Sequence, residues 1–185
     1  MCAVVYIDGS NHAGVSAAVG VRIFTNGEVH EMSHKYESPK HSLPHETLAF
    51  IEAVKHLVDR NIPPHEVSFY TDDQFIAYYN HNPGLKVWQN AVGMIKSLCR
   101  KFYTAELAQV VLEYLHNSRV NKIKGHAYLV DNHRVDYLAH CALRDKTPDS
   151  YDVWLYKPQR KWVSTEKCID VFFPFTTMEE LAELA

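Results

Sequence analysis

The chain has 185 residues, of which 46% are apolar and 22% are charged, and its formal net charge is −3. This length suffices for one domain with a core and an appendage, and the composition is that of an ordinary globular protein rather than a disordered or fibrous one. The slightly negative charge excludes binding of polyanions through a generally basic surface, so any contact with nucleic acid must come from local clusters.

The apolar runs are all too short to cross a bilayer, and the first residues lack the basic lead and long apolar segment of a signal peptide. The 4 cysteines and 12 histidines are scattered, without a CxxC pair or the HExxH spacing of a zinc site. We therefore expect a cytoplasmic protein with reduced thiols and no zinc centre.

The chain begins with an apolar segment, residues 3–10, that is rich in β-branched residues and reaches Asp8 just before a Gly-Ser pair. This composition predicts a buried strand, with Asp8 at the point where the strand leaves the core. Taken alone, Asp8 would equally suit an ordinary Asp-Gly turn. Residues 17–24 and 29–36 predict two further strands joined by an Asn-Gly turn, which gives a three-stranded antiparallel meander.

A helix and a second buried strand follow the meander. Apolar residues recur at helical spacing over 45–60, and Glu46 lies at the edge of that stripe, although a first-turn acid that complements the helix dipole would look the same. Residues 66–71 predict a strand that runs into Asp72. If the two strands are parallel neighbours, Asp8 and Asp72 lie side by side at their carboxyl ends. Converging carboxylates without obvious cations indicate a site for a hard divalent metal ion.

The remaining pattern predicts further elements and a boundary. The elements are helices over about 74–79, 85–102 and 105–115, a strand over 120–123 and a helix over 132–144. Asp136 lies near the first turn of that last helix. A turn-rich stretch at Thr147–Ser150 divides the chain into a domain of residues 1–148 and a C-terminal extension of residues 149–185, which is aromatic-rich and then acidic. We expect the extension to pack on the domain, bind a protein partner or mediate self-association.

Two segments without acidic residues carry the local positive charge. Residues 74–105 contain four cations and Trp88, and residues 117–130 contain three more cations. Basic segments studded with aromatic residues beside an acidic metal site suit a nucleic-acid backbone. Either segment taken singly fits a solvated helix face with core aromatics equally well.

Four motifs in this order resemble ribonuclease H of type 1. They are Tyr6-Ile7-Asp8-Gly9-Ser10, His45-Glu46-Thr47-Leu48-Ala49, Tyr70-Thr71-Asp72-Asp73-Gln74, and Lys124-Gly125-His126-Ala127 followed by Asp131-Asn132-His133-Arg134-Val135-Asp136. The resemblance covers about residues 3–145. It implies an α/β fold with a five-stranded mixed sheet, made of the antiparallel meander plus parallel strands, and helices on its flanks.

The resemblance also implies a site and an activity. Asp8, Glu46, Asp72 and Asp136 would hold two Mg²⁺ ions, which Mn²⁺ would replace, and His126 would be a mobile base or product-release group. Family members hydrolyse the RNA strand of RNA–DNA hybrids and leave 5′-phosphate and 3′-hydroxyl ends. Two metal ions suit that reaction, because one activates water and the other stabilises the leaving oxygen.

By the same resemblance and by charge, we expect a set of residues to bind the hybrid. They are Gly9, Ser10, Asn11, Gln74, Lys86, Trp88, Lys96, Arg100, Lys101, Lys124 and Asn132. Ser42-Leu43-Pro44-His45 replaces a polar pair that family members commonly have before the helix Glu and that contacts the hybrid. Residues 85–102 lie where some members carry a basic protrusion that grips the DNA strand, and their four cations with Trp88 make a modest version of it, so we expect weaker or more salt-sensitive hybrid binding.

Two alternatives stand beside this hypothesis. A DNA-directed nuclease or resolvase on the same fold would use the same carboxylates and metal ions. A non-catalytic nucleic-acid-binding or assembly domain would rely on the extension and would bind no metal.

Overall fold

The computed structural model describes residues 2–12, 16–37, 43–81, 86–123 and 129–155. Lys124, His126 and most of the predicted extension lie outside the described residues. Within the described residues, no helix is long and apolar enough to cross a bilayer.

A five-stranded sheet forms the centre of the fold. Its strands are β1 (Ala3–His12), β2 (Ser16–Thr25), β3 (Glu28–Glu37), β4 (Val67–Thr71) and β5 (Arg119–Lys122), in the order β3-β2-β1-β4-β5. The meander β1–β3 is antiparallel, whereas β4 and β5 run parallel to β1. The predicted mixed sheet is confirmed.

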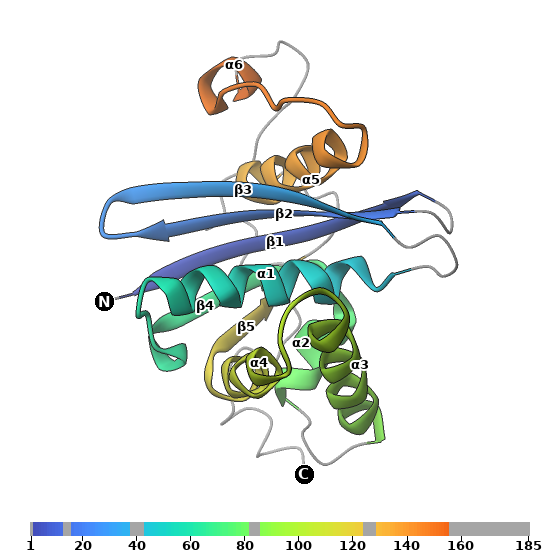
Figure 1. Cartoon of the computed structure of the whole chain (residues 1–185). Coiled ribbons are helices and arrows are strands. Elements are labelled where there is room, and N and C mark those ends of the chain that lie inside the picture. The colour runs from blue at the N-terminus through green and yellow to red at the C-terminus, as the bar shows by residue number, and fades with distance from the viewer. Residues whose placement is uncertain (1, 13–15, 38–42, 82–85, 124–128, 156–185) are drawn as a thin grey trace.

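Helices cover both faces of the sheet. They are α1 (His45–Asp59), α2 (Gln74–His81), α3 (Lys86–Phe102), α4 (Ala105–Asn117), α5 (Val130–Leu143) and α6 (Tyr151–Leu155), with a 3-10 turn η1 (Pro64–Glu66) before β4. Helix α5 lies on one face, over β1, β2 and β3, with α6 beyond it (Figure 1). Helix α1 packs on the other face, and α3 and α4 pack against it. Because both faces are covered, β2 is buried along nearly its whole length.

Two glycines let these helices approach the sheet closely. A Cβ atom at Gly9 of β1 would lie 2.6 Å from the carbonyl carbon of His45, at the start of α1. A Cβ atom at Gly20 of β2 would lie 2.0 Å from the carbonyl oxygen of Val135 in α5. Any larger residue would push the helix away, so each glycine fixes the height of one helix above the sheet.

Several element boundaries differ from the sequence prediction, and two of the differences bear on the predicted site residues. Strand β1 does not end at Asp8 but continues to His12, because residues 9–12 pair with Ser16–Val19 of β2. Helix α5 begins at Val130, two residues earlier than expected, so Asn132 lies inside its first turn. Tertiary pairing thus overrides the weak strand propensity of the Gly-Ser-Asn-His segment.

Candidate active site

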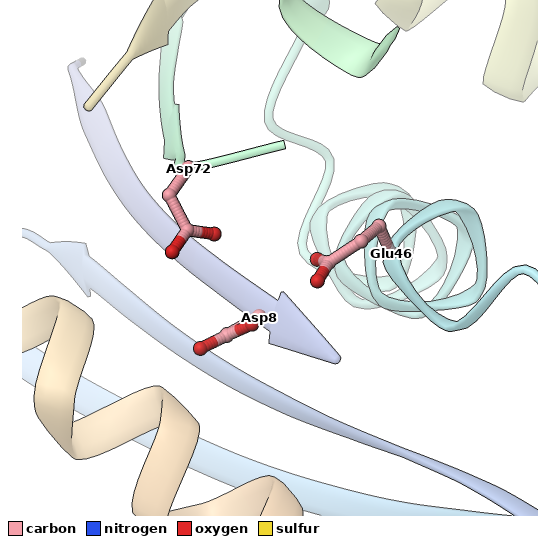
Figure 2. Close-up of side chains that lie close together, drawn as sticks. All are labelled: Asp8, Glu46 and Asp72. Atoms are coloured by element: carbon pink, nitrogen blue, oxygen red, sulfur yellow. The ribbon is translucent and has the colours of Figure 1, made fainter. Parts of the chain in front are cut away.

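Three carboxylates from separate elements converge at one edge of the sheet. Asp8 comes from β1, Glu46 from the first turn of α1, and Asp72 directly follows β4. One oxygen from each of these side chains lies within 4.8 Å of the others, and Figure 2 shows the three pointing into a common space. This spacing suits three ligands of one small cation.

Strand register explains the meeting of Asp8 and Asp72. Strands β1 and β4 are parallel neighbours, with Tyr6 opposite Tyr70, so the residues two positions further along come to the same level. Asp73, the next residue, also raises the pKa of Glu46 through its charge, but its side chain is turned to α2, where its Oδ1 accepts a hydrogen bond from the backbone N–H of Ile76 at 2.8 Å and caps the helix. Local geometry therefore separates the two neighbouring acids into a site residue and a helix cap.

The cluster is electrostatically strained without a cation. Burial, then the charges of Asp72 and Asp136, raise the pKa of Asp8 well above its ordinary value. Burial, then Asp8 and Asp72, raise the pKa of Glu46. Glu46 Oε2 is buried and has no hydrogen-bond partner among the described residues. A hard divalent cation would relieve the repulsion and satisfy that oxygen, so these residues fit such an ion.

Asp136, the fourth predicted carboxylate, lies on α5 outside this group of three. Its charge acts on Asp8, and its Oδ1 is 3.3 Å from His140 Nε2 one helical turn further on. The other nitrogen of that imidazole, Nδ1, is 3.3 Å from Ser10 Oγ of β1. His140 was not among the predicted residues, although its position four residues after Asp136 on a helix is a signal that could have found it.

Lys122 also borders the site and was missed. Its Nζ donates hydrogen bonds to the carbonyl oxygens of Asp72 at 2.5 Å and Ile123 at 3.3 Å. The ammonium group of Lys122 therefore fixes the backbone that carries Asp72. The sequence placed Lys122 within a basic segment but offered no sign that its side chain turns back to β4.

The structure presents most of the predicted hybrid-binding residues at the surface. Asn11 is exposed, with its Nδ2 3.1 Å from His45 Nδ1, and Gln74 is exposed at the start of α2. The exposed cations on α3 are Lys86, Lys96, Arg100 and Lys101, and Trp88 belongs to the same helix.

Three predicted residues are less open to a ligand. Ser10 is largely buried, Gly9 is partly buried and donates its N–H to Asp8 Oδ1 at 2.7 Å, and Asn132 is only 6% exposed. Asn132 lies in the first turn of α5, and its burial leaves little of its side chain open to a ligand. A direct contact between Asn132 and a hybrid is therefore not what this geometry favours.

A mixed sheet in the order β3-β2-β1-β4-β5, with carboxylates gathered from within β1, from just after β4 and from the start of α1, defines a ribonuclease H-like fold with an acidic site. The family model of RNase H matches residues 2–144, which is most of the chain. The protein therefore belongs to the RNase H family of nucleases. No curated protein matches the chain.

Solved structures share this fold at low sequence identity. RNase H1 from the halophilic archaeon Halobacterium salinarum NRC-1 is 18% identical over 78% of this chain and 99% of its own, with a TM-score of 0.55. LC9-RNase H1, a type 1 RNase H with the type 2 active-site motif, is 16% identical over 88% of this chain and 86% of its own, with a TM-score of 0.53. A foamy viral protease-reverse transcriptase in complex with dsDNA is 19% identical over 78% of this chain and 95% of its own, with a TM-score of 0.51.

Proposed function

We propose that this protein is a divalent-metal-dependent endonuclease that hydrolyses the RNA strand of RNA–DNA hybrids and leaves 5′-phosphate and 3′-hydroxyl ends. The observation that carries the proposal is the convergence of Asp8, Glu46 and Asp72 within 4.8 Å, in a chain of the RNase H family. Glu46 Oε2 is buried and has no hydrogen-bond partner among the described residues, and this oxygen supports a cation at this place.

Four carboxylates would hold two magnesium ions, which Mn²⁺ would replace. Asp8, Glu46 and Asp72 form the tight set, and the charge of Asp136 acts on Asp8 from α5. Bound there, the ions would supply an activated water and stabilise the charge on the leaving 3′-oxygen. Lys122 holds the backbone of Asp72, and Gly9 donates to Asp8, so both ligands are oriented before a cation arrives.

Other residues would bind the substrate and move a proton. The exposed cations of α3 suit the phosphates of a nucleic-acid strand, since their charge is concentrated on one helix of an otherwise slightly acidic chain. Asn11 and Gln74 are exposed near the carboxylates and can hydrogen-bond 2′-hydroxyl groups, which distinguish RNA from DNA. His126, between the last strand and α5, would take or deliver a proton near neutral pH.

The test uses an end-labelled RNA–DNA hybrid, with duplex RNA, duplex DNA and single strands as competing substrates. Wild-type protein is compared with Asp72→Asn and with the matched control Asp73→Asn, each in Mg²⁺, in Mn²⁺ and in EDTA. Asn caps a helix nearly as well as Asp, so the control keeps α2 and differs from the test variant by one position.

We expect wild type and Asp73→Asn to cut only the RNA strand of the hybrid, with metal present, and Asp72→Asn to lose at least about a hundredfold in rate. Cleavage of duplex DNA instead would establish the DNA-directed alternative. Binding of nucleic acid without any cleavage, and without metal uptake in a calorimetric titration, would establish the non-catalytic alternative.

A further inference from the structure

The face of the sheet that carries α5 holds a buried ionic cluster. Arg22 of β2 and Arg134 of α5 are 4% and 2% exposed. Glu31 of β3 pairs with both, at 3.4 Å from Arg22 Nε and 2.6 Å from Arg134 Nη2, and Asp131 Oδ1 lies 3.0 Å from Arg22 Nη1. The two positive charges of the guanidinium groups are thus balanced by two carboxylates, and this pairing offsets the free-energy cost of removing the charges from water.

The segment that follows α5 returns to cover this cluster. The ring of Tyr151 lies 3.8 Å from the guanidinium carbon of Arg22, and the ring of Trp154 lies 5.4 Å from that of Arg134. Trp154 is only 3% exposed. Aromatic faces attract guanidinium groups and exclude water from them, so these rings complete the desolvated environment that the ion pairs require.

Hydrogen bonds fix the start of the same segment to α5. Arg134 Nη2 donates to the carbonyl oxygen of Asp149 at 3.0 Å. The hydroxyl of Tyr137 donates to Asp149 Oδ2 at 3.0 Å and accepts from the backbone N–H of Asp149, also at 3.0 Å. We call Asp149, Tyr151 and Trp154 the clasp. A boundary at residue 148 would place all of the clasp outside the catalytic domain, yet its contacts are those of a core element.

The helix geometry connects the clasp to the acidic site. Arg134, Val135 and Asp136 are consecutive, so Arg134 and Asp136 point about 200° apart around the axis of α5. Arg134 is held over β3 and β2, whereas Asp136 contacts His140, which reaches Ser10 of β1. The carbonyl oxygen of Val135, between them, rests on Gly20, the register partner of Asp8. Any rotation of α5 that frees Arg134 therefore moves Asp136 relative to Asp8.

We propose that the clasp is a positioning element: by seating Tyr151 and Trp154 on Arg22 and Arg134, it fixes the rotation of α5 and holds Asp136 toward Asp8 for metal binding. This inference rests on the proposed function, because it assigns Asp136 to the metal site. It makes residues 149–155 a working part of the catalytic domain.

The test measures α5 and the metal site separately in the full-length chain. The main variant is Tyr151→Ala with Trp154→Ala, and Tyr151→Ala alone serves if the double variant does not fold. Tyr151→Phe keeps the ring and is the rescue variant, and Val153→Ala, whose residue is 57% exposed on the same helix, is the matched control. Amide hydrogen exchange measures the protection of α5, and calorimetric titration measures the affinity of the acidic site for Mn²⁺. Both are carried out well below the melting temperature of every variant.

We expect the clasp variants to exchange the amides of α5 faster and to bind Mn²⁺ roughly tenfold more weakly. Tyr151→Phe and Val153→Ala should match wild type in both measurements. Faster exchange with unchanged Mn²⁺ affinity would reduce the clasp to a stabilising contact and overturn the proposal, as would unchanged exchange. If wild type itself binds no Mn²⁺, the proposed function fails first, and that result is recognisable before any variant is compared.

Discussion

Two glutamates on the same helix, Glu46 and Glu52 of α1, are both largely buried, but their side chains have opposite surroundings: acids around Glu46 and hydrogen-bond donors around Glu52. The side chain of Glu52 is 11% exposed and accepts a hydrogen bond from Tyr36 at 2.7 Å and another from Tyr103. The side chain of Glu46 is 17% exposed, faces Asp8 and Asp72, and leaves Oε2 without a hydrogen bond among the described residues.

The pKa values follow these surroundings. Burial alone would raise the pKa of Glu52, but the hydrogen bonds from Tyr103 and Tyr36, together with the charges of Lys55 and His56, outweigh it and lower the pKa. For Glu46, burial and the neighbouring carboxylates act in the same direction and raise the pKa. A buried acid surrounded by donors is therefore a structural group, whereas a buried acid surrounded by acids is incomplete without a cation.

Of the substitutions that test this difference between Glu46 and Glu52, Glu52→Ala should have the largest effect on stability. The substitution removes the acceptor of two phenols and opens a cavity between α1 and β3, so the free energy of unfolding should fall by about 2–4 kcal/mol. Urea unfolding of wild type and variant measures the difference. The exposed acid Glu113, on α4, supplies the control, since Glu113→Ala should change stability by less than about 0.5 kcal/mol. A loss below about 1 kcal/mol for Glu52→Ala would mean that the tyrosines find other partners.

The role of Glu52 illustrates which contacts a sequence pattern predicts. Helical periodicity predicted α1, and the resemblance predicted the importance of Glu46, because both signals are local. The partners of Glu52 are Tyr36 and Tyr103, which lie in different elements and share no spacing rule with it. Only the packing of β3 and of the α3–α4 connection against α1 reveals the group.

The same difference between local and tertiary signals separates Asp8 and Asp72 from Asp136. Asp8 and Asp72 could be placed side by side from sequence, because parallel neighbouring strands end at one edge of a sheet. The contacts that position Asp136 could not be predicted from sequence. They depend on Arg22, Glu31 and Gly20, which meet α5 only after the meander folds. Arg22 stands within an apolar strand, but nothing in the sequence shows that Glu31 and Asp131 pair with it.

The contributions of Glu46 and Glu52 to stability should depend on pH in opposite ways. The folded pKa of Glu46 is raised above its ordinary value of 4.5, so the folded state holds the proton more tightly, and stability from this group falls as pH rises above that value. The folded pKa of Glu52 is lowered, so its contribution is present above 4.5 and is lost as pH falls toward the folded pKa. The two groups should therefore bend the stability profile in opposite directions.

Thermal unfolding of metal-free protein across pH 3–8 would measure this, with Glu46→Gln and Glu52→Gln as the variants. Glu46→Gln should gain about 1–2 kcal/mol near pH 7 and flatten the decline toward high pH. Glu52→Gln should flatten the decline toward low pH. Saturating Mg²⁺ should reverse the order of wild type and Glu46→Gln, because the cation stabilises only the chain that can ligate it. An unchanged high-pH limb in Glu46→Gln would show that Glu46 is not the strained acid.

The smallest effect is expected at His140, where a half-exposed imidazole joins Asp136 to Ser10. His140→Ala removes the imidazole that lies 3.3 Å from Asp136 Oδ1 but leaves the clasp and the four proposed metal-binding carboxylates in place, so Mn²⁺ affinity should fall by about three- to tenfold with little change in melting temperature. His116→Ala, on an exposed histidine of α4, should leave the affinity unchanged. Equal Mn²⁺ affinity in the two variants would show that the clasp and Gly20 orient Asp136 without help from β1. A loss in His140→Ala alone would mean that Asp136 needs both a fixed helix and a fixed carboxylate, a requirement that Glu46, anchored on the apolar face of α1, does not share.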